Sequence, residues 1–172
     1  MRTNTTIALP FLVAWFFVAT LASAQPHDDK ERAELAKALP EAKISLQRGV
    51  TASAKTGTPI SAKYEVEDGK LQLSVYTTKG DAFTEVIVDH KTGTVAKAEP
   101  ITKADDLKDA KAQREAMAKA KRSLAAAAAE AVKANKGYRA VSAFPALKDG
   151  HPVVDVTVVK GTEWKTVSEK LD

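Results

Sequence analysis

An internal repeat with an offset of 81 residues constrains this chain more than any other feature of its sequence. Sliding the chain against itself by that offset aligns turn dipeptides and an aromatic position without gaps. The aligned pairs are Asp68-Gly69 with Asp149-Gly150, Lys79-Gly80 with Lys160-Gly161, Ser61-Ala62 with Ser142-Ala143, and Phe83 with Trp164. Self-similarity at a fixed period indicates that one supersecondary unit occurs more than once. We therefore expect two units with the same order of helices and strands.

The first unit is predicted to be a helix followed by an antiparallel meander. An apolar residue at every fourth position after Pro40 indicates one face of a helix, and Gly57 with Pro59 ends it. The residues of that face are Ala42, Leu46, Val50 and Ala54. Alternation of apolar and polar residues over 60–67 predicts a half-buried strand. Asp68-Gly69 favours a tight hairpin turn, and further strands are expected over 71–75, 83–89 and 94–97.

The second unit repeats this order with a helix over 123–135 and strands over 139–147, 153–160 and 163–169. Position 172 corresponds to position 91, so the second unit lacks the last turn and short strand of the first. We expect this to leave an edge with unpaired backbone groups, which is a template for another chain. Between the units, residues 103–122 are rich in alanine and charged residues, which favours an exposed helical linker.

The first residues have the composition of an export signal. Arg2 is followed by an apolar run over 7–22, and Ala22-Ser23-Ala24 supplies small residues before a cleavage site. The run is shorter than the roughly 20 residues that a membrane-spanning helix needs. We expect cleavage after Ala24 and an exported, periplasmic or secreted protein, with an uncleaved membrane anchor as the alternative.

Composition excludes several kinds of site. The chain contains no cysteine, which rules out disulfides, thiolate metal sites, a cysteine nucleophile and a lipid-anchored cysteine. The formal net charge is only +4, with both signs interspersed, and this favours solubility over nucleic-acid binding.

The end of the first unit resembles the PepSY domain. In that family an apolar strand is followed by Asp, then Thr-Gly, then an apolar residue, and Asp89, Thr92, Gly93 and Val95 match this pattern. The resemblance covers about Glu41–Lys97, and residues 122–172 resemble a truncated copy without the ending. It implies an α+β fold of two cystatin-like units, each a helix packed on a three- to four-stranded antiparallel meander sheet. The expected organisation is a signal peptide at 1–24, a charged segment at 25–40, a first domain at 41–98, a helical linker at 99–121 and a second domain at 122–172.

The resemblance also implies an extracytoplasmic, non-catalytic module that binds or inhibits a secreted or periplasmic peptidase. A protein that binds a small ligand or an envelope component is the alternative. We expect a protein partner, no nucleic acid, and no stable membrane insertion after signal cleavage.

No catalytic, cofactor or metal site is predicted, and no cofactor. Asp89 is interpreted as a turn former, because its side chain can accept hydrogen bonds from backbone N–H groups two residues on. His90 points to the opposite face of a strand from Asp89, and His27 and His151 have no ligand spacing. Other weak candidates are the carboxylate pairs and the lysines at equivalent turns: Asp28-Asp29, Asp105-Asp106, Lys79 and Lys160. Phe83 and Trp164 are expected to share a packing role, with an interface anchor as the alternative for Trp164.

Overall fold

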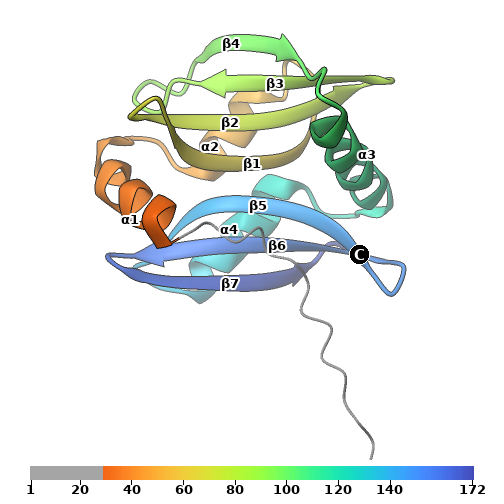
Figure 1. Cartoon of the computed structure of the whole chain (residues 1–172). Coiled ribbons are helices and arrows are strands. Elements are labelled where there is room, and N and C mark those ends of the chain that lie inside the picture. The colour runs from red at the N-terminus through yellow and green to blue at the C-terminus, as the bar shows by residue number, and fades with distance from the viewer. Residues whose placement is uncertain (1–28) are drawn as a thin grey trace, which may run out of the picture.

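The computed structural model describes residues 29–172, which form an α+β fold of four α-helices, one short 3-10 helix and seven strands (Figure 1). The elements are α1 (Asp29–Ala38), η1 (Leu39–Glu41), α2 (Leu46–Ser53), β1 (Thr58–Glu67), β2 (Lys70–Lys79), β3 (Ala82–Val88), β4 (Val95–Pro100), α3 (Ala104–Lys119), α4 (Leu124–Ala134), β5 (Arg139–Lys148), β6 (His151–Lys160) and β7 (Glu163–Lys170). The predicted signal peptide, His27 and Asp28 lie outside the described residues. Within 29–172, no helix is both long enough and apolar enough to span a bilayer.

All seven strands belong to one antiparallel sheet, in the order β4-β3-β2-β1-β5-β6-β7 (Figure 1). The expectation of a separate three- to four-stranded sheet in each unit is therefore wrong. The two halves join because β1 pairs with β5, through Ala62 with Ala143 and Lys63 with Ser142. Unjoined, each of these strands would present a row of unpaired backbone groups.

The junction relates the two halves by an approximate two-fold axis. Ala62 pairs with Ala143, the residue at its own 81-residue offset, so the axis passes between these two strands. Register within each half follows the same offset, since Ala62 pairs with Val75 and Ala143 pairs with Val156. Both first strands also shift register at one equivalent place, before Ser61 and before Ser142.

The two Asp-Gly dipeptides form the turns that the sequence predicts. Asp68 and Asp149 have φ values of 50° and 52°, and the glycines that follow them have φ values of 72° and 81°. A two-residue hairpin turn with both φ values positive matches the right-handed twist of its strands, and Asp-Gly tolerates that conformation best. The turns connect β1 to β2 and β5 to β6 at the same point of each half.

The main core lies between one face of the sheet and helices α2 and α4. The sheet contributes alternate residues such as Ala62, Tyr64 and Leu73, which are all fully buried. The two helices pack against each other at equivalent positions, because the Gln47 side-chain amide donates to the carbonyl of Ala128 at 3.1 Å. The core is aliphatic and small, and Tyr64 is its largest fully buried side chain.

Helix α2 begins later than the position after Pro40 that the apolar spacing predicts. Its N-cap is Ser45, whose hydroxyl accepts from the backbone N–H of Arg48 at 3.2 Å. The preceding N–H groups of Lys43 and Ile44 donate to the carbonyl of His90, at 2.8 and 3.1 Å. These long-range bonds hold the backbone before Ser45 outside the helix.

Helix α3 is not the exposed linker that its composition predicts. Ala110 and Ala116 are 2% and 0% exposed, because their small side chains let the helix approach the sheet closely. Gln113 accepts a hydrogen bond from the hydroxyl of Ser61 at 2.6 Å. Ser61 and Ala62 point to opposite faces of β1, so α3 covers the face that α2 and α4 leave open (Figure 1).

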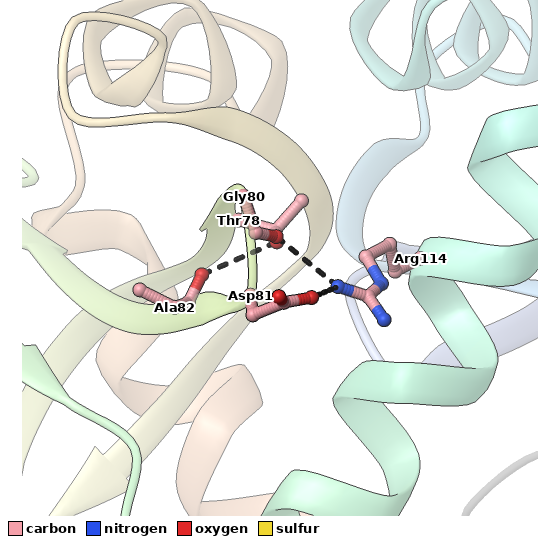
Figure 2. A network of polar contacts seen from close by, with 5 residues as sticks. All are labelled: Thr78, Gly80, Asp81, Ala82 and Arg114. Carbon is pink, nitrogen blue, oxygen red and sulfur yellow. Dashed lines mark hydrogen bonds and ion pairs between the residues drawn. The ribbon is translucent and has the colours of Figure 1, made fainter.

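Arg114 fixes α3 to the turn between β2 and β3. Figure 2 shows its guanidinium beside that turn, where it donates to the carbonyl of Gly80 at 3.1 Å and to the Asp81 carboxylate at 3.2 Å. The same guanidinium lies 5.0 Å from the centroid of the Phe83 ring. The Thr78 hydroxyl donates to the carbonyls of Gly80 and Ala82, both at 3.2 Å, which holds the turn in shape.

Candidate functional site

A cavity of about 400 Å³ lies between α3 and the face of the sheet that α3 covers. This volume is within the range of small-molecule pockets. The lining comes from four regions: α3, the centre of β1 with β2, the middle of β5, and β6. The lining residues are Ser61, Lys63, Tyr76, Asp106, Asp109, Ala110, Ala112, Gln113, Ser142, Phe144, Pro145, Ala146, Asp155 and Thr157.

The floor of the cavity carries a hydroxyl group without a protein partner. Ser142 is 2% exposed and lines the cavity, and its hydroxyl has no hydrogen bond within residues 29–172. Its equivalent in the first half, Ser61, donates to Gln113 instead. The Ser142 hydroxyl faces the cavity and is a group to which a ligand could hydrogen-bond.

Most charges around the cavity are already paired. Lys63 Nζ lies 2.5 Å from Glu65 Oε2, and Lys148 Nζ lies 3.0 Å from Asp155 Oδ1. Asp155 also accepts from the Ser168 hydroxyl at 2.6 Å. The exceptions are two exposed carboxylates on α3, Asp106 and Asp109, which form no ion pair in the described part of the chain. The mouth of the cavity is therefore negative in a chain whose overall charge is positive.

Tyr76 on β2 also lies within the negative electrostatic potential of nearby carboxylates. Burial raises the pKa of its hydroxyl far above the usual value, and the carboxylates of Glu85, Glu65 and Asp106 raise that pKa further. Lys63 Nζ lies 6.0 Å from the centroid of the Tyr76 ring. The phenol therefore stays protonated and forms a neutral aromatic wall.

A second candidate feature is the outer edge of β7. In residues 29–172 this strand pairs with β6 alone and has no neighbour on its other side. All eight residues of β7 pair with β6 without a register shift. Glu163 lies opposite Lys160 at one end, and Lys170 lies opposite Val153 at the other. At its end the Lys170 carbonyl accepts from the Arg122 guanidinium at 2.9 Å, and the outward N–H and C=O groups before it are available to an added strand.

The opposite edge of the sheet is less suited to strand addition. Strand β4 has six residues, ends in Pro100, and shifts register against β3 between Ile87 and Val88. Proline lacks a backbone N–H group, and irregular edges oppose pairing with another chain.

Asp89 has the structural role predicted for it. Its carboxylate accepts from the N–H groups of Lys91 and Thr92, both at 2.8 Å, and Gly93 follows with a φ of 78°. These backbone bonds, the one from Thr92 first, lower the pKa of the Asp89 carboxyl group. The Asp…Thr-Gly ending therefore builds the turn before β4.

The other candidate residues are scattered over the molecule. His151 Nδ1 lies 3.0 Å from Asp172 Oδ2, which lowers the pKa of that carboxyl group. His90 Nδ1 is buried and has no partner in the described part. Lys160 Nζ lies 5.9 Å from the centroid of the Tyr138 ring. Across residues 29–172, no three His, Asp or Glu side chains are grouped closely enough to hold a metal ion.

Phe83 and Trp164 occupy equivalent positions with different exposure. Phe83 is 5% exposed and packs with Ile60 and Ala110 under α3. Trp164 is half-buried, and Arg32 of α1 lies 5.7 Å from its ring centroid. The shared packing role is confirmed for both residues, because Trp164 also packs against the main core, although it stays half-buried on the edge strand β7.

Sequence reasoning missed the cavity. Its residues come from both halves and from α3, which was expected to be exposed, so no local pattern brings them together. The one available signal was Ala110 and Ala116, whose small side chains permit a close approach of the helix to the sheet.

No family model matches the chain, and no curated protein matches it. The PepSY resemblance therefore stays a prediction. Among solved structures, the fold is similar to that of a protein described as a candidate lipoprotein of Clostridium difficile 630. The similarity has a TM-score of 0.41 at 13% sequence identity, and covers 70% of this chain and 79% of the other.

Proposed function

We propose that this chain is an exported, non-catalytic interaction module that holds an extended segment of a partner protein along the outer edge of β7. Export is supported by the leader-like sequence, with Arg2, the apolar run over 7–22 and Ala22-Ser23-Ala24. A duplicated unit is supported by the equal strand register at the 81-residue offset, and its PepSY-like character rests on the Asp89, Thr92, Gly93 and Val95 pattern alone.

The single observation that carries this proposal is the asymmetry of the two sheet edges. At the first end, β3 is followed by β4, whose Pro100 and shifted register protect the edge. At the second end β7 has neither feature. An extended peptide added to β7 would gain backbone hydrogen bonds along the strand, and the exposed part of the half-buried Trp164 would add an aromatic contact.

The partner that the PepSY resemblance favours is a secreted or periplasmic peptidase. Holding such an enzyme requires a complementary surface but no reactive side chain. A non-catalytic role is supported by Asp89, whose carboxylate accepts backbone hydrogen bonds in a turn, and by His151, which pairs with Asp172. The alternative, a protein that binds a small ligand or an envelope component, is supported by the cavity beneath α3.

Site-specific photo-crosslinking on the intact chain tests the proposal. A photoreactive amino acid at Thr166, an exposed residue of β7, is compared with the same group at Ala96, an exposed residue of β4. We expect a peptidase from the native exported fraction to crosslink at position 166 and not at 96. Equal crosslinking at both positions, capture at 96 alone, or capture of only a second copy of this chain would contradict it.

A proline substitution provides the functional arm. Thr166→Pro removes a backbone donor from β7, and Ala96→Pro is the matched change on β4. We expect Thr166→Pro to weaken both peptidase capture and inhibition, and Ala96→Pro to leave them unchanged. Circular dichroism of both variants checks that the sheet is retained.

A further inference from the structure

We propose that the cavity beneath α3 is a binding site for a small organic cation, a protonated primary amine on a short apolar stem. This site is separate from the β7 edge and independent of the function proposed for it. Three features of the cavity carry the inference: its uncompensated charge, the free hydroxyl on its floor, and the character of its walls.

The charge of the site selects a cation. Lys63 and Asp155 line the cavity, but each is paired, with Glu65 and Lys148 respectively. Asp106 and Asp109 have no such partner in the described residues, and they lie one turn apart on the same face of α3. Two unpaired carboxylates at the mouth of a partly enclosed cavity attract a positive group and disfavour an anion.

The floor of the site supplies a hydrogen-bond acceptor. Ser142 is 98% buried, and its hydroxyl has no partner within 29–172. Thr157 on the neighbouring strand β6 also lines the cavity, and its hydroxyl forms no hydrogen bond in the described part. A protonated amine donates three hydrogen bonds and accepts none. It can therefore bind to the hydroxyl and carboxylate oxygens of this site, which accept hydrogen bonds.

The walls of the site suit an apolar stem. Phe144 and Pro145 of β5 line one side, and the ring of Tyr76 lines another. Aromatic faces also attract cations, and Lys63 already lies over the Tyr76 ring. The ammonium group of such an amine would contact the hydroxyl and carboxylate groups, and its short alkyl chain would contact the apolar walls.

Two sources could present this chemistry: a free diamine, or the lysine side chain of a bound peptide. NMR titration of the isotope-labelled exported protein distinguishes them. One arm uses cadaverine, and the other uses a short lysine-containing peptide with blocked termini, compared with its Nε-acetylated form. Glutarate, a dianion of similar length, and calcium chloride are the controls.

We expect cadaverine to cause saturable shifts centred on Tyr76, Ser142 and Thr157. Tighter binding of the peptide than of cadaverine, abolished by acetylation, would assign the amine to a protein side chain. Equal or tighter binding of glutarate, or displacement of cadaverine by calcium at equal concentration, would overturn the proposal.

Matched variants localise the effect. Asp106→Asn with Asp109→Asn should weaken cadaverine binding about tenfold or more, since each loses a charge-assisted contact. Asp105→Asn is the control, because it removes a carboxylate from the same first turn of α3 but does not line the cavity. Ser142→Ala should weaken binding severalfold. An equal loss in the Asp105 variant, or no loss in the double variant, would refute the site.

Discussion

Ser61 and Ser142 occupy equivalent positions in the two halves of one sheet, yet their hydroxyls meet different surroundings. Ser61 donates to Gln113 of α3, whereas Ser142 faces the cavity without a partner. Both residues are almost fully buried. Because α3 is a single helix on one side of a two-fold arrangement, it satisfies one serine and encloses space beside the other. The sheet is nearly symmetric, but α3 makes its surroundings asymmetric at the cavity where we propose a ligand site.

The ends of the sheet differ in the same way. The first half continues from β3 through the Asp89 turn into β4, and the second half has no corresponding strand in the structure. Lys170 stands at the position equivalent to Asp89, so the turn-forming side chain is also missing. The two candidate surfaces, the cavity and the β7 edge, therefore both lie where the halves differ.

The largest expected effect on stability comes from truncating Leu73 and Val154, which occupy equivalent core positions but differ in side-chain size. Leu73 and Val154 are both fully buried. Leu73→Ala should lower the free energy of unfolding by about 2–5 kcal/mol, and Val154→Ala by about 2 kcal/mol, because the valine substitution removes fewer carbon atoms from the core. Chemical denaturation should show a single transition in both variants, since one sheet joins the halves. A separate early transition for the first half would contradict this.

Arg139 provides a contact that has no counterpart in the other half. Its guanidinium donates to the carbonyls of Leu39, Ala42 and Ile44, and it lies 5.3 Å from the Tyr64 ring centroid. Arg139→Met should destabilise the protein by about 1–3 kcal/mol, because it removes three hydrogen bonds and leaves the Ala42 carbonyl without a donor, whereas the Leu39 and Ile44 carbonyls still accept from Ala42 and Tyr64. Thr58→Ala, at the equivalent position, should cost less than about 0.5 kcal/mol. Thermal unfolding of both variants measures the difference, and equal costs would refute it.

The serine pair should give a smaller but informative difference. Ser61→Ala loses the bond to Gln113 and should cost about 1 kcal/mol. Ser142→Ala loses no protein hydrogen bond, so the free protein should change by less than about 0.5 kcal/mol. Denaturant midpoints of the two variants check this, and a larger loss for Ser142→Ala would mean that its hydroxyl has a structural partner.

The smallest effect is a change in acid sensitivity at the Asp89 turn. Backbone bonds lower the pKa of this carboxyl group in the folded state. The stability it contributes is fully present above the unfolded-state pKa of about 3.9 and is lost as the pH falls through the lower folded-state value. The advantage of the wild type over Asp89→Asn should therefore shrink in that acidic window. Unfolding measured from pH 6 downwards tests this, and a constant difference would contradict it.

The local structure was predictable because its signals are local. The Asp-Gly turns depend on residues that tolerate positive φ, and strand alternation depends on a period of two, so the hairpins lie where the sequence places them. The second helix was also expected from its composition, and Ser123 caps it by accepting from Ala126. These features need no knowledge of distant contacts.

The joining of the halves could not be predicted in the same way. The β1–β5 pair connects residues far apart in the chain through Ala62 and Ala143, whose side chains carry no strong pattern. The start of α2 at Leu46 depends on the carbonyl of His90, which is also distant in sequence. The cavity requires both the joined sheet and the packed α3. Long-range pairing therefore decides the features on which the proposed sites depend.

The most direct test of the central claim, that the β7 edge holds a partner, is amide hydrogen exchange on the exported protein with and without its crosslinked partner. We expect protection to rise over 163–170 in the complex and to stay unchanged over 95–100 in β4. Increased protection confined to β4 or to α3, with β7 exchanging as in the free protein, would contradict it.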